Sequence, residues 1–143
     1  MLIEPISQSY NEISVDDIFS FPHTFTLDQL SLFSDLTGDK NPIHLDEEFS
    51  RNSGFETNLV YGMLSASLFS KLIGMYCPGK NGLYLSQTLD FKKPIYIDEE
   101  VIVRGTVTKK FDKFQMLKMK TEIIDQKNIF VSGEASAKFI VNE

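Results

Sequence analysis

From residue 81 onward, apolar and polar residues alternate with a period of two over four stretches. Such alternation is typical of antiparallel strands, because one face of the sheet packs on the core and the other meets water. The positions expected on the buried face are Leu83, Leu85, Leu89 and Phe91, then Val101, Val103, Gly105 and Val107, then Leu117, Met119, Thr121 and Ile123, and finally Ile129, Val131, Gly133, Ala135, Ala137 and Phe139. FDKF and DQKN are short enough to be hairpin turns. The small residues Gly133, Ala135 and Ala137 are expected to leave a shallow trough for a helix backbone.

Residues 61–77, YGMLSASLFSKLIGMYC, have a helical period instead. Lys71 is the only charged residue in this stretch, and apolar or small side chains fill nearly every other position. A helix without a polar face is buried, so we expect this one to lie in the core. Its apolar spine is Met63, Leu64, Leu68, Leu72 and Met75. The sequence therefore predicts an α+β fold, a curved antiparallel sheet laid around one central helix.

The chain before this helix is less regular. Thr26 and Gln29 have the spacing of a capping box and Gly38 is placed as a stop, which together predict a helix over residues 27–37. FPHTFT, residues 21–26, predicts a short strand, and residues 1–20 have only weak periodicity. Residues 39–59 show no repeat, although Asp46 is placed to cap a short helix, EEFSRN. Irregular segments of this length in a compact domain are often functional.

Composition narrows the class of protein. A chain of 143 residues that is 42% hydrophobic and 24% charged is typical of one globular domain, which we expect over residues 1–143. The chain start lacks the pattern of a secretory signal and no apolar run is long enough to span a membrane, so we expect a cytoplasmic protein without a membrane partner. The single Cys77, expected to be a buried structural thiol, excludes an internal disulfide. Because this cysteine and the two histidines are dispersed along the chain, no metal site or cofactor is expected. His23 is taken as structural or solvent-facing.

Charge and surface suggest the partners. Residues 1–70 carry 11 acidic and two basic side chains, residues 71–143 carry nine acidic and 12 basic ones, and the net charge of −6 argues against nucleic acid as a partner. The candidates for contacts with phosphate are Lys71, Lys80, Lys92, Lys93, Lys109 and Lys110, although solvated strand faces explain most of them. One helix is too small to cover the buried face of the sheet, and the edge strands of the sheet have unpaired backbone groups. A second copy of the chain would cover both, so we expect a homodimer.

The stretch TGDKNPIH places a carboxylate, Asp39, and an imidazole, His44, five residues apart. Pro42 fixes its own φ and holds Asn41 extended, so the link between the pair is stiff. A carboxylate and an imidazole held together can position and activate one water, and the Asn41 amide can brace them. Ordinary turn chemistry explains the same residue types, so the spacing alone leaves both interpretations open.

TGDKNPIHLDEEF followed by FETNLVYGMLSASLFSKLIG resembles the MaoC-like, (R)-specific enoyl-CoA hydratases and 3-hydroxyacyl dehydratases of the hot-dog superfamily. Their signature, Ser/Thr-Gly-Asp-x-Asn-Pro-hydrophobic-His, matches residues 37–44 without a gap, and the similarity continues through PGKNGLYLSQTLDFKKPIYIDEEV. The resemblance implies a hot-dog fold with an active-site overhang before the central helix. It also implies syn addition of water to a trans-2-enoyl thioester of coenzyme A or acyl carrier protein, giving the (R)-3-hydroxyacyl thioester, or the reverse dehydration.

The resemblance also assigns roles. Asp39 and His44 become the catalytic pair, and Asn41 and Ser70 support them. For Ser70, a hydrogen bond back to its own helix explains the residue equally well. Gly62 opens the central helix, where its free N–H is the expected donor to the thioester oxyanion. Tyr61, at a position where many relatives carry histidine, is expected to contact substrate together with two residues of the helix. These are Met63 and Leu68. The helix face that includes Leu72, Ile73 and Met75 would wall the acyl tail, although core packing explains it equally well.

Other functions on the same fold remain open at this point. A thioesterase normally needs a carboxylate on or near the central helix, and residues 61–77 contain none. A non-catalytic acyl-thioester-binding subunit, or a dehydratase subunit that is inactive without its partner, would keep the pocket. Fold analogy does not separate these classes, whereas the intact motif favours the hydratase.

Overall fold

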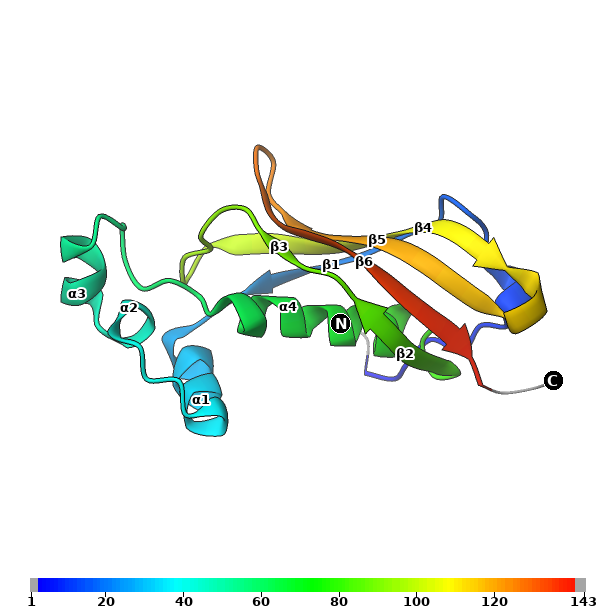
Figure 1. Ribbon diagram of the computed structural model, residues 1–143, viewed down its shortest axis with the longest axis horizontal. Coiled ribbons are helices and arrows are strands. Elements are labelled where there is room, and N and C mark those ends of the chain that lie inside the picture. The colour runs from blue at the N-terminus through cyan, green and yellow to red at the C-terminus, as the bar shows by residue number, and fades with distance from the viewer. Residues whose placement is uncertain (1–2, 141–143) are drawn as a thin grey trace.

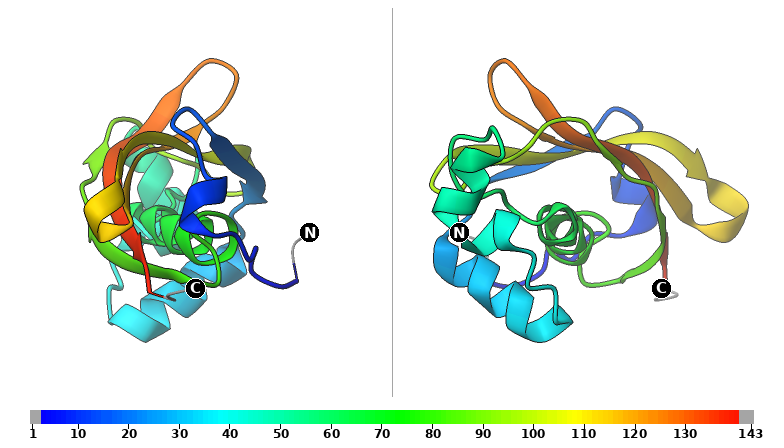
Figure 2. Two further views of the ribbon diagram at one scale, coloured as in Figure 1. Left: turned by 90° about the vertical axis from the view of Figure 1, so that its right-hand side faces the viewer. Right: turned by 60° about the vertical axis from the view of Figure 1, so that its left-hand side comes forward.

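The computed structural model describes residues 3–140, and its centre is one antiparallel sheet. The strands lie in the order β1-β4-β5-β6-β2, and the short β3 also pairs with β6. Their bounds are β1 Ile18–Thr24, β2 Gly82–Gln87, β3 Asp90–Phe91, β4 Glu100–Phe111, β5 Met116–Ile124 and β6 Ile129–Phe139. The sheet is not closed, and it curls over the central helix (Figure 1; Figure 2). The predicted antiparallel sheet is thereby confirmed, and the short strand expected at residues 21–26 corresponds to β1, which begins earlier, at Ile18, and forms one edge of the sheet.

The alternating pattern is confirmed in β4, in β5 and in β6 from Val131 onward, whereas Ile129, expected on the buried face, is 42% exposed. The inward residues of these strands are buried, namely Val101, Val103 and Val107, then Leu117, Met119, Thr121 and Ile123, and then Val131, Ala135, Ala137 and Phe139. Both expected turns are hairpins: a 3-10 turn, η3 (Asp112–Phe114), joins β4 to β5, and the carboxylate of Asp125 accepts the N–H groups of Lys127 and Asn128 between β5 and β6. Hydrophobic burial on one face therefore sets the register of this half of the sheet.

The prediction is wrong for three of the four inward residues of the stretch 83–91. Leu83, Leu85 and Phe91 are 46%, 45% and 52% exposed, whereas Leu89 packs against the core as expected. Tyr84, between the two leucines, faces the core in their place, and the stretch divides into β2 and β3 with a register shift between Tyr84 and Ser86. The trough is also filled differently from the expectation. A Cβ at Gly133 would collide with the Thr88 carbonyl, so the backbone between β2 and β3 fills that space rather than the helix.

The central helix comprises α4 (Gly62–Lys71) and one π-helical turn, η2 (Leu72–Tyr76). Its buried stripe is Ser65, Ala66, Phe69, Leu72 and Ile73, and Leu72 packs where a side chain at Gly105 would otherwise lie. The expectation of burial on nearly every side is wrong for the single chain. A second stripe at helical spacing is exposed and consists of Met63, Ser67, Ser70 and Gly74.

Three helices form the overhang at the end of the molecule where α4 begins (Figure 1). α1 (Leu27–Thr37) has the predicted capping box at Thr26 and ends at Gly38 in the left-handed region, φ +80°. α3 (Glu47–Asn52) is capped by the Asp46 carboxylate, as expected. The short α2 (Pro42–Leu45) was not predicted; it forms because Asn41 caps it and Pro42 suits the first helical position.

The remaining residues singled out from the sequence are structural. Cys77 is fully buried, and burial raises the pKa of its thiol to about 12, which keeps it protonated. The ring of His23 packs edge-on against Phe25, and its Nε2 lies 3.1 Å from Oε1 of Gln29. A 3-10 turn, η1 (Tyr10–Glu12), packs Tyr10 against Phe139. Within residues 3–140, no helix is both long and apolar enough to cross a membrane.

Candidate active site

The loop from Asp39 to His44 is stiffened by its own hydrogen bonds. The Asp39 N–H donates to Oγ1 of Thr37 (3.2 Å), and the Asp39 carboxylate accepts the N–H of Asn41 (3.0 Å). The side-chain oxygen of Asn41 in turn accepts the N–H of Ile43 (3.1 Å), which starts α2. Asn41 therefore connects the carboxylate to the helix turn that carries His44, and it braces the loop through its backbone and its side chain alike.

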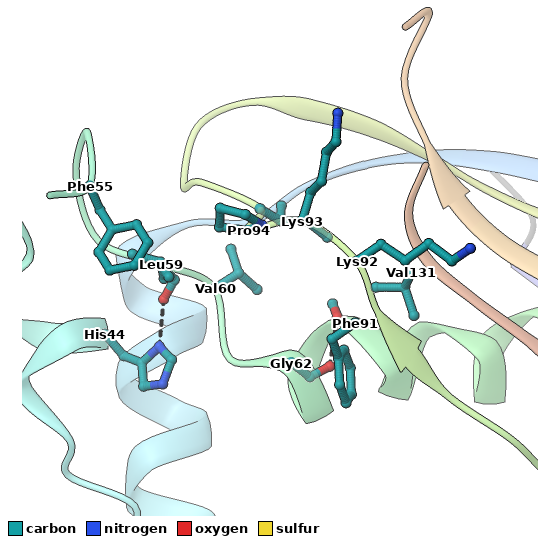
Figure 3. A pocket seen from close by; sticks show the side chains of 12 residues that line it. His44, Phe55, Leu59, Val60, Gly62, Phe91, Lys92, Lys93, Pro94 and Val131 are labelled. Carbon is teal, nitrogen blue, oxygen red and sulfur yellow. Dashed lines mark hydrogen bonds between the residues drawn. The ribbon is translucent and has the colours of Figure 1, made fainter. Parts of the chain in front are cut away.

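His44 is oriented by the chain that leads into α4. Its Nδ1 lies 2.8 Å from the carbonyl oxygen of Leu59, as the dashed line in Figure 3 shows. A carbonyl can only accept, so Nδ1 carries the proton and Nε2 of the neutral ring keeps a free lone pair. The Asn58 side chain donates to the His44 carbonyl (3.1 Å), which fixes the backbone from the same segment. The imidazole is thus held in one tautomer with its basic nitrogen available.

Gly62 is the first residue of α4, and Tyr61 precedes it in an extended conformation (φ −55°, ψ 130°). The first N–H groups of a helix have no partner within the helix and lie at the positive end of its dipole. The ring of Phe91 packs against Gly62 so closely that a Cβ added there would lie 3.0–3.2 Å from three ring carbons (Figure 3). Gly62 therefore offers a free backbone donor in a position where any side chain would meet Phe91.

Two cavities meet at these residues. The larger, about 660 Å³, is lined by Phe33, Thr37, Asp39, His44, Tyr61, Gly62, Met63 and Phe91. The other, about 400 Å³, is lined by His44, Phe55, Leu59, Val60, Gly62, Ser65, Phe91, Lys92, Lys93, Pro94, Ile95 and Val131. Three residues, His44, Gly62 and Phe91, belong to both. Figure 3 shows Lys92 and Lys93 across the second cavity from His44. The arrangement gives a carboxylate, a basic nitrogen and an amide donor around one space, with a cationic rim beside it.

The structure brings together most, but not all, of the expected site residues. Asp39, His44, Gly62, Tyr61 and Met63 line the larger cavity. The two other expected residues on the helix lie elsewhere. Leu68 packs against the hydrophobic core, and Ser70 lies on the exposed stripe beside a third cavity. Ser70 is eight positions after Gly62 in the helix, or about 12 Å along the axis. Neither residue reaches Asp39 and His44 within one chain.

Three contributors were missed in the sequence. The Leu59 carbonyl is a backbone group, which a side-chain pattern does not reveal. Phe91 and Phe33 line the cavity, but their apolar character pointed to the core. Among residues 3–140, no group of three or more His, Cys, Asp or Glu side chains is arranged to hold a metal ion.

Comparison with known proteins agrees with this geometry. The family model described as MaoC like domain matches residues 11–128. The chain is 40% identical over 111 residues to an (R)-specific enoyl-CoA hydratase of Aeromonas caviae, covering 77% of this chain and 83% of that protein. It is 37% identical over 134 residues to a tomato protein (Solanum lycopersicum) named 3-hydroxyacyl-[acyl-carrier-protein] dehydratase FERN, mitochondrial, covering 92% and 80% of the two chains.

Solved structures are similar as well. The (R)-hydratase from A. caviae involved in PHA biosynthesis superposes with a TM-score of 0.86 at 36% identity, covering 90% of this chain and 98% of that one. The unliganded R-hydratase PhaJ1 from Pseudomonas aeruginosa gives 0.87 at 30% identity, covering 94% and 86%. The sequence and the structure thus match the same group of proteins. The chain also has the hot-dog fold, the overhang and the motif from Thr37 to His44. The chain belongs to the MaoC-like family of the hot-dog superfamily.

Proposed function

We propose that this protein catalyses the reversible hydration of trans-2-enoyl thioesters to (R)-3-hydroxyacyl thioesters. The observation that carries the proposal is that Asp39, His44 and Gly62, the first residue of α4, line one cavity. Addition of water to an enoyl thioester needs three things: an oriented water, a group that moves its proton, and a donor to the carbonyl oxygen as charge develops there. Each of the three groups meets one of these needs.

In the hydration direction, the water donates one hydrogen bond to the Asp39 carboxylate and the other to the free Nε2 of His44. The imidazole takes the second proton as the hydroxide forms its bond to C3. The C2–C3 double-bond electrons move toward the carbonyl, whose oxygen is held by the Gly62 N–H. The His44 imidazolium then returns the proton to C2, on the same face, and the neutral thioester is restored. Dehydration follows the same steps in reverse.

The two cavities divide the substrate between them. With the thioester carbonyl at Gly62, the reacting carbons face Asp39 and His44 in the larger cavity, and the acyl tail continues past Phe33 and Met63. The carrier arm leaves through the smaller cavity, past Lys92 and Lys93. These ammonium groups suit the phosphates of coenzyme A or of the phosphopantetheine arm of an acyl carrier protein.

The first experiment mixes the purified protein with crotonyl-CoA and follows the loss of the conjugated enoyl-thioester absorbance and the release of free thiol in the same sample. We expect the absorbance to fall without thiol release. Thiol release with an unchanged absorbance would instead show a thioesterase. If neither signal changed with crotonyl-CoA or with crotonyl acyl carrier protein, the proposed reaction would be wrong, and a binding or partner-dependent subunit would be the remaining explanation.

Lys92 provides a second prediction. Its side chain is exposed, whereas Lys93 donates to the Asn128 side chain (2.7 Å). We expect Lys92→Met to raise KM for crotonyl-CoA about three- to fivefold with little change in kcat, as is typical of an exposed charge pair. The same variant should leave the hydration of crotonyl-N-acetylcysteamine, which has no phosphate, unchanged. Lys113→Met on the distant β4–β5 hairpin is the matched control. An equal effect on both substrates would contradict the phosphate contact.

We further propose that the active form is a homodimer. The exposed stripe of α4, with Met63 59% exposed, lies beside the edge strand β2, whose Leu83 and Leu85 are also exposed. A second copy would cover both features, and a two-fold axis crossing α4 near Ser67 would bring Ser70 of the partner subunit beside Leu64, in the first turn of the helix. That arrangement would supply the serine that the single chain leaves far from the catalytic pair.

Ser67→Arg tests the homodimer. A charged side chain at the centre of the stripe cannot be buried against a copy of itself, so we expect a monomer in light scattering and at least a tenfold lower hydration rate. Gln126→Arg, at the exposed tip of the β5–β6 hairpin, adds the same charge elsewhere and should remain dimeric and active. A wild-type protein that is monomeric and fully active would contradict the proposal.

A further inference from the structure

We propose that Tyr61 is a positioning residue that holds both catalytic groups in place; this inference rests on the proposed hydration. Its ring stacks on the His44 imidazole, with ring centroids 3.8 Å apart and planes inclined by 27°. Its hydroxyl donates to the main-chain carbonyl oxygen of Asp39 at 2.6 Å. Through its aromatic ring and its hydroxyl, one side chain contacts both members of the pair.

Tyr61 is itself firmly held. The side chain is only 2% exposed, and the ring of Phe33 on α1 packs against it with centroids 4.9 Å apart. Its backbone carbonyl accepts the N–H of Ser65, in the first turn of α4 (3.0 Å). Gly62, the expected oxyanion donor, is the next residue. The three groups that hydration requires are thus tied to the N-terminus of α4 through a single residue.

The contacts assign a role that differs from acid–base chemistry and from substrate binding. The hydroxyl proton is already engaged with the Asp39 carbonyl, so it is not directed at the reacting carbons. The stack opposes tilting of the imidazole, while the bond from Nδ1 to Leu59 fixes the in-plane direction of Nε2. The hydroxyl prevents the Asp39 backbone from moving away from His44. Such preorganisation acts on the rate of the chemical step, because small displacements of catalytic groups have large effects on rate.

Two substitutions separate the contributions. Tyr61→Phe keeps the stack on His44 and removes only the bond to Asp39, and we expect kcat for crotonyl-CoA to fall about three- to tenfold with KM unchanged within about twofold. Tyr61→Leu also removes the stack, and we expect kcat to fall about 100-fold. Tyr76→Phe is the matched control, because Tyr76 is also a stacked tyrosine, on Phe21, but lies outside the site. It should leave both constants unchanged.

Nuclear magnetic resonance gives a readout that does not depend on activity. The chain has two histidines, so the ring nitrogens of His44 are identified by comparison with His23→Gln. At alkaline pH, where imidazoles are neutral, the wild type and Tyr61→Phe should show the Nδ1–H tautomer for His44. Tyr61→Leu should lose the ring-current shift of the stack and average between the two tautomers.

The outcomes are distinct. A wild-type protein that hydrates neither crotonyl-CoA nor crotonyl acyl carrier protein would refute the proposed function, while the His44 signals would still test whether Tyr61 orients the ring. Wild-type His44 signals in Tyr61→Leu would overturn the positioning role. So would an unchanged kcat in Tyr61→Phe, or a loss expressed in KM, which would make Tyr61 a substrate contact. A lower melting temperature with normal kcat would show that Tyr61 serves stability alone.

Discussion

Asp39→Asn and His44→Gln are each expected to lower kcat for hydration of crotonyl-CoA by about 10²- to 10⁴-fold, the usual contribution of a positioned acid–base group. The two substitutions are chosen to preserve the loop. Asn at position 39 keeps an oxygen that can accept the N–H of Asn41, and Gln at position 44 keeps an N–H that can reach the Leu59 carbonyl. The loss of activity would therefore reflect the missing charge of the carboxylate or the missing basic nitrogen. The measurement is kcat, from the steady-state change in enoyl-thioester absorbance.

Matched controls come from the same chain. His23→Gln removes the other histidine, which contacts Gln29 away from the cavity, and Asp35→Asn removes an exposed carboxylate on α1 that lies 3.9 Å from Lys40. Both should keep wild-type rates, and circular dichroism should show the same fold in all four variants. Full activity of Asp39→Asn or of His44→Gln would place the proton transfer elsewhere.

The second large effect on kcat is expected for Gly62→Pro. Proline has no N–H, suits the first position of a helix, and needs an extended residue before it, which Tyr61 provides at φ −55° and ψ 130°. The substitution therefore deletes the proposed oxyanion donor while α4 keeps a compatible start. We expect kcat to fall about 10²- to 10³-fold, corresponding to about 2.7–4 kcal/mol of transition-state stabilisation.

Gly62→Ala is the control for bulk. Its Cβ would press on the Phe91 ring at 3.0–3.2 Å, but that ring is half exposed and can give way, and the N–H remains. We expect a much smaller loss than for proline, and Gly62→Ala combined with Phe91→Leu should recover part of it. Equal losses in Gly62→Pro and Gly62→Ala would mean that space, and not the amide donor, limits the reaction.

Much of the fold followed from periodicity, because one-sided burial imposes a strict pattern. In β4 and β5 every residue predicted to face inward is buried. The predicted capping box of Thr26 and Gln29 is present at the start of α1. The pattern failed at Leu83, Leu85 and Phe91, in a stretch that contains a register shift and divides into β2 and β3. Alternation cannot reveal such a shift, because it depends on which backbone groups pair across the sheet.

The site was predictable to a similar degree. A short motif with Pro42 at its centre stiffens its own backbone, so Asp39 and His44 could be paired from sequence spacing and resemblance. The contacts that orient them come from Leu59 and Tyr61, 15 and 22 residues further along the chain from their respective partners. Such contacts arise only when the overhang folds back on the start of α4. Ser70 could not be placed from one chain alone, because in the proposed homodimer it reaches the site of the partner subunit.

The bond from the Leu59 carbonyl to His44 has an evolutionary consequence. In the proposed mechanism, Leu59 orients the imidazole that transfers the proton and Gly62 presents the amide to the thioester carbonyl, so a stretch of backbone only a few residues long sets the spacing between these two groups. In the same proposal, the walls around the acyl tail are Phe33 on α1, Met63 on α4 and Phe91 on β3, all outside the stretch from 59 to 62. Mutations in those walls can therefore change which acyl groups are accepted without altering the reaction, whereas a single-residue insertion between 59 and 62 would end it.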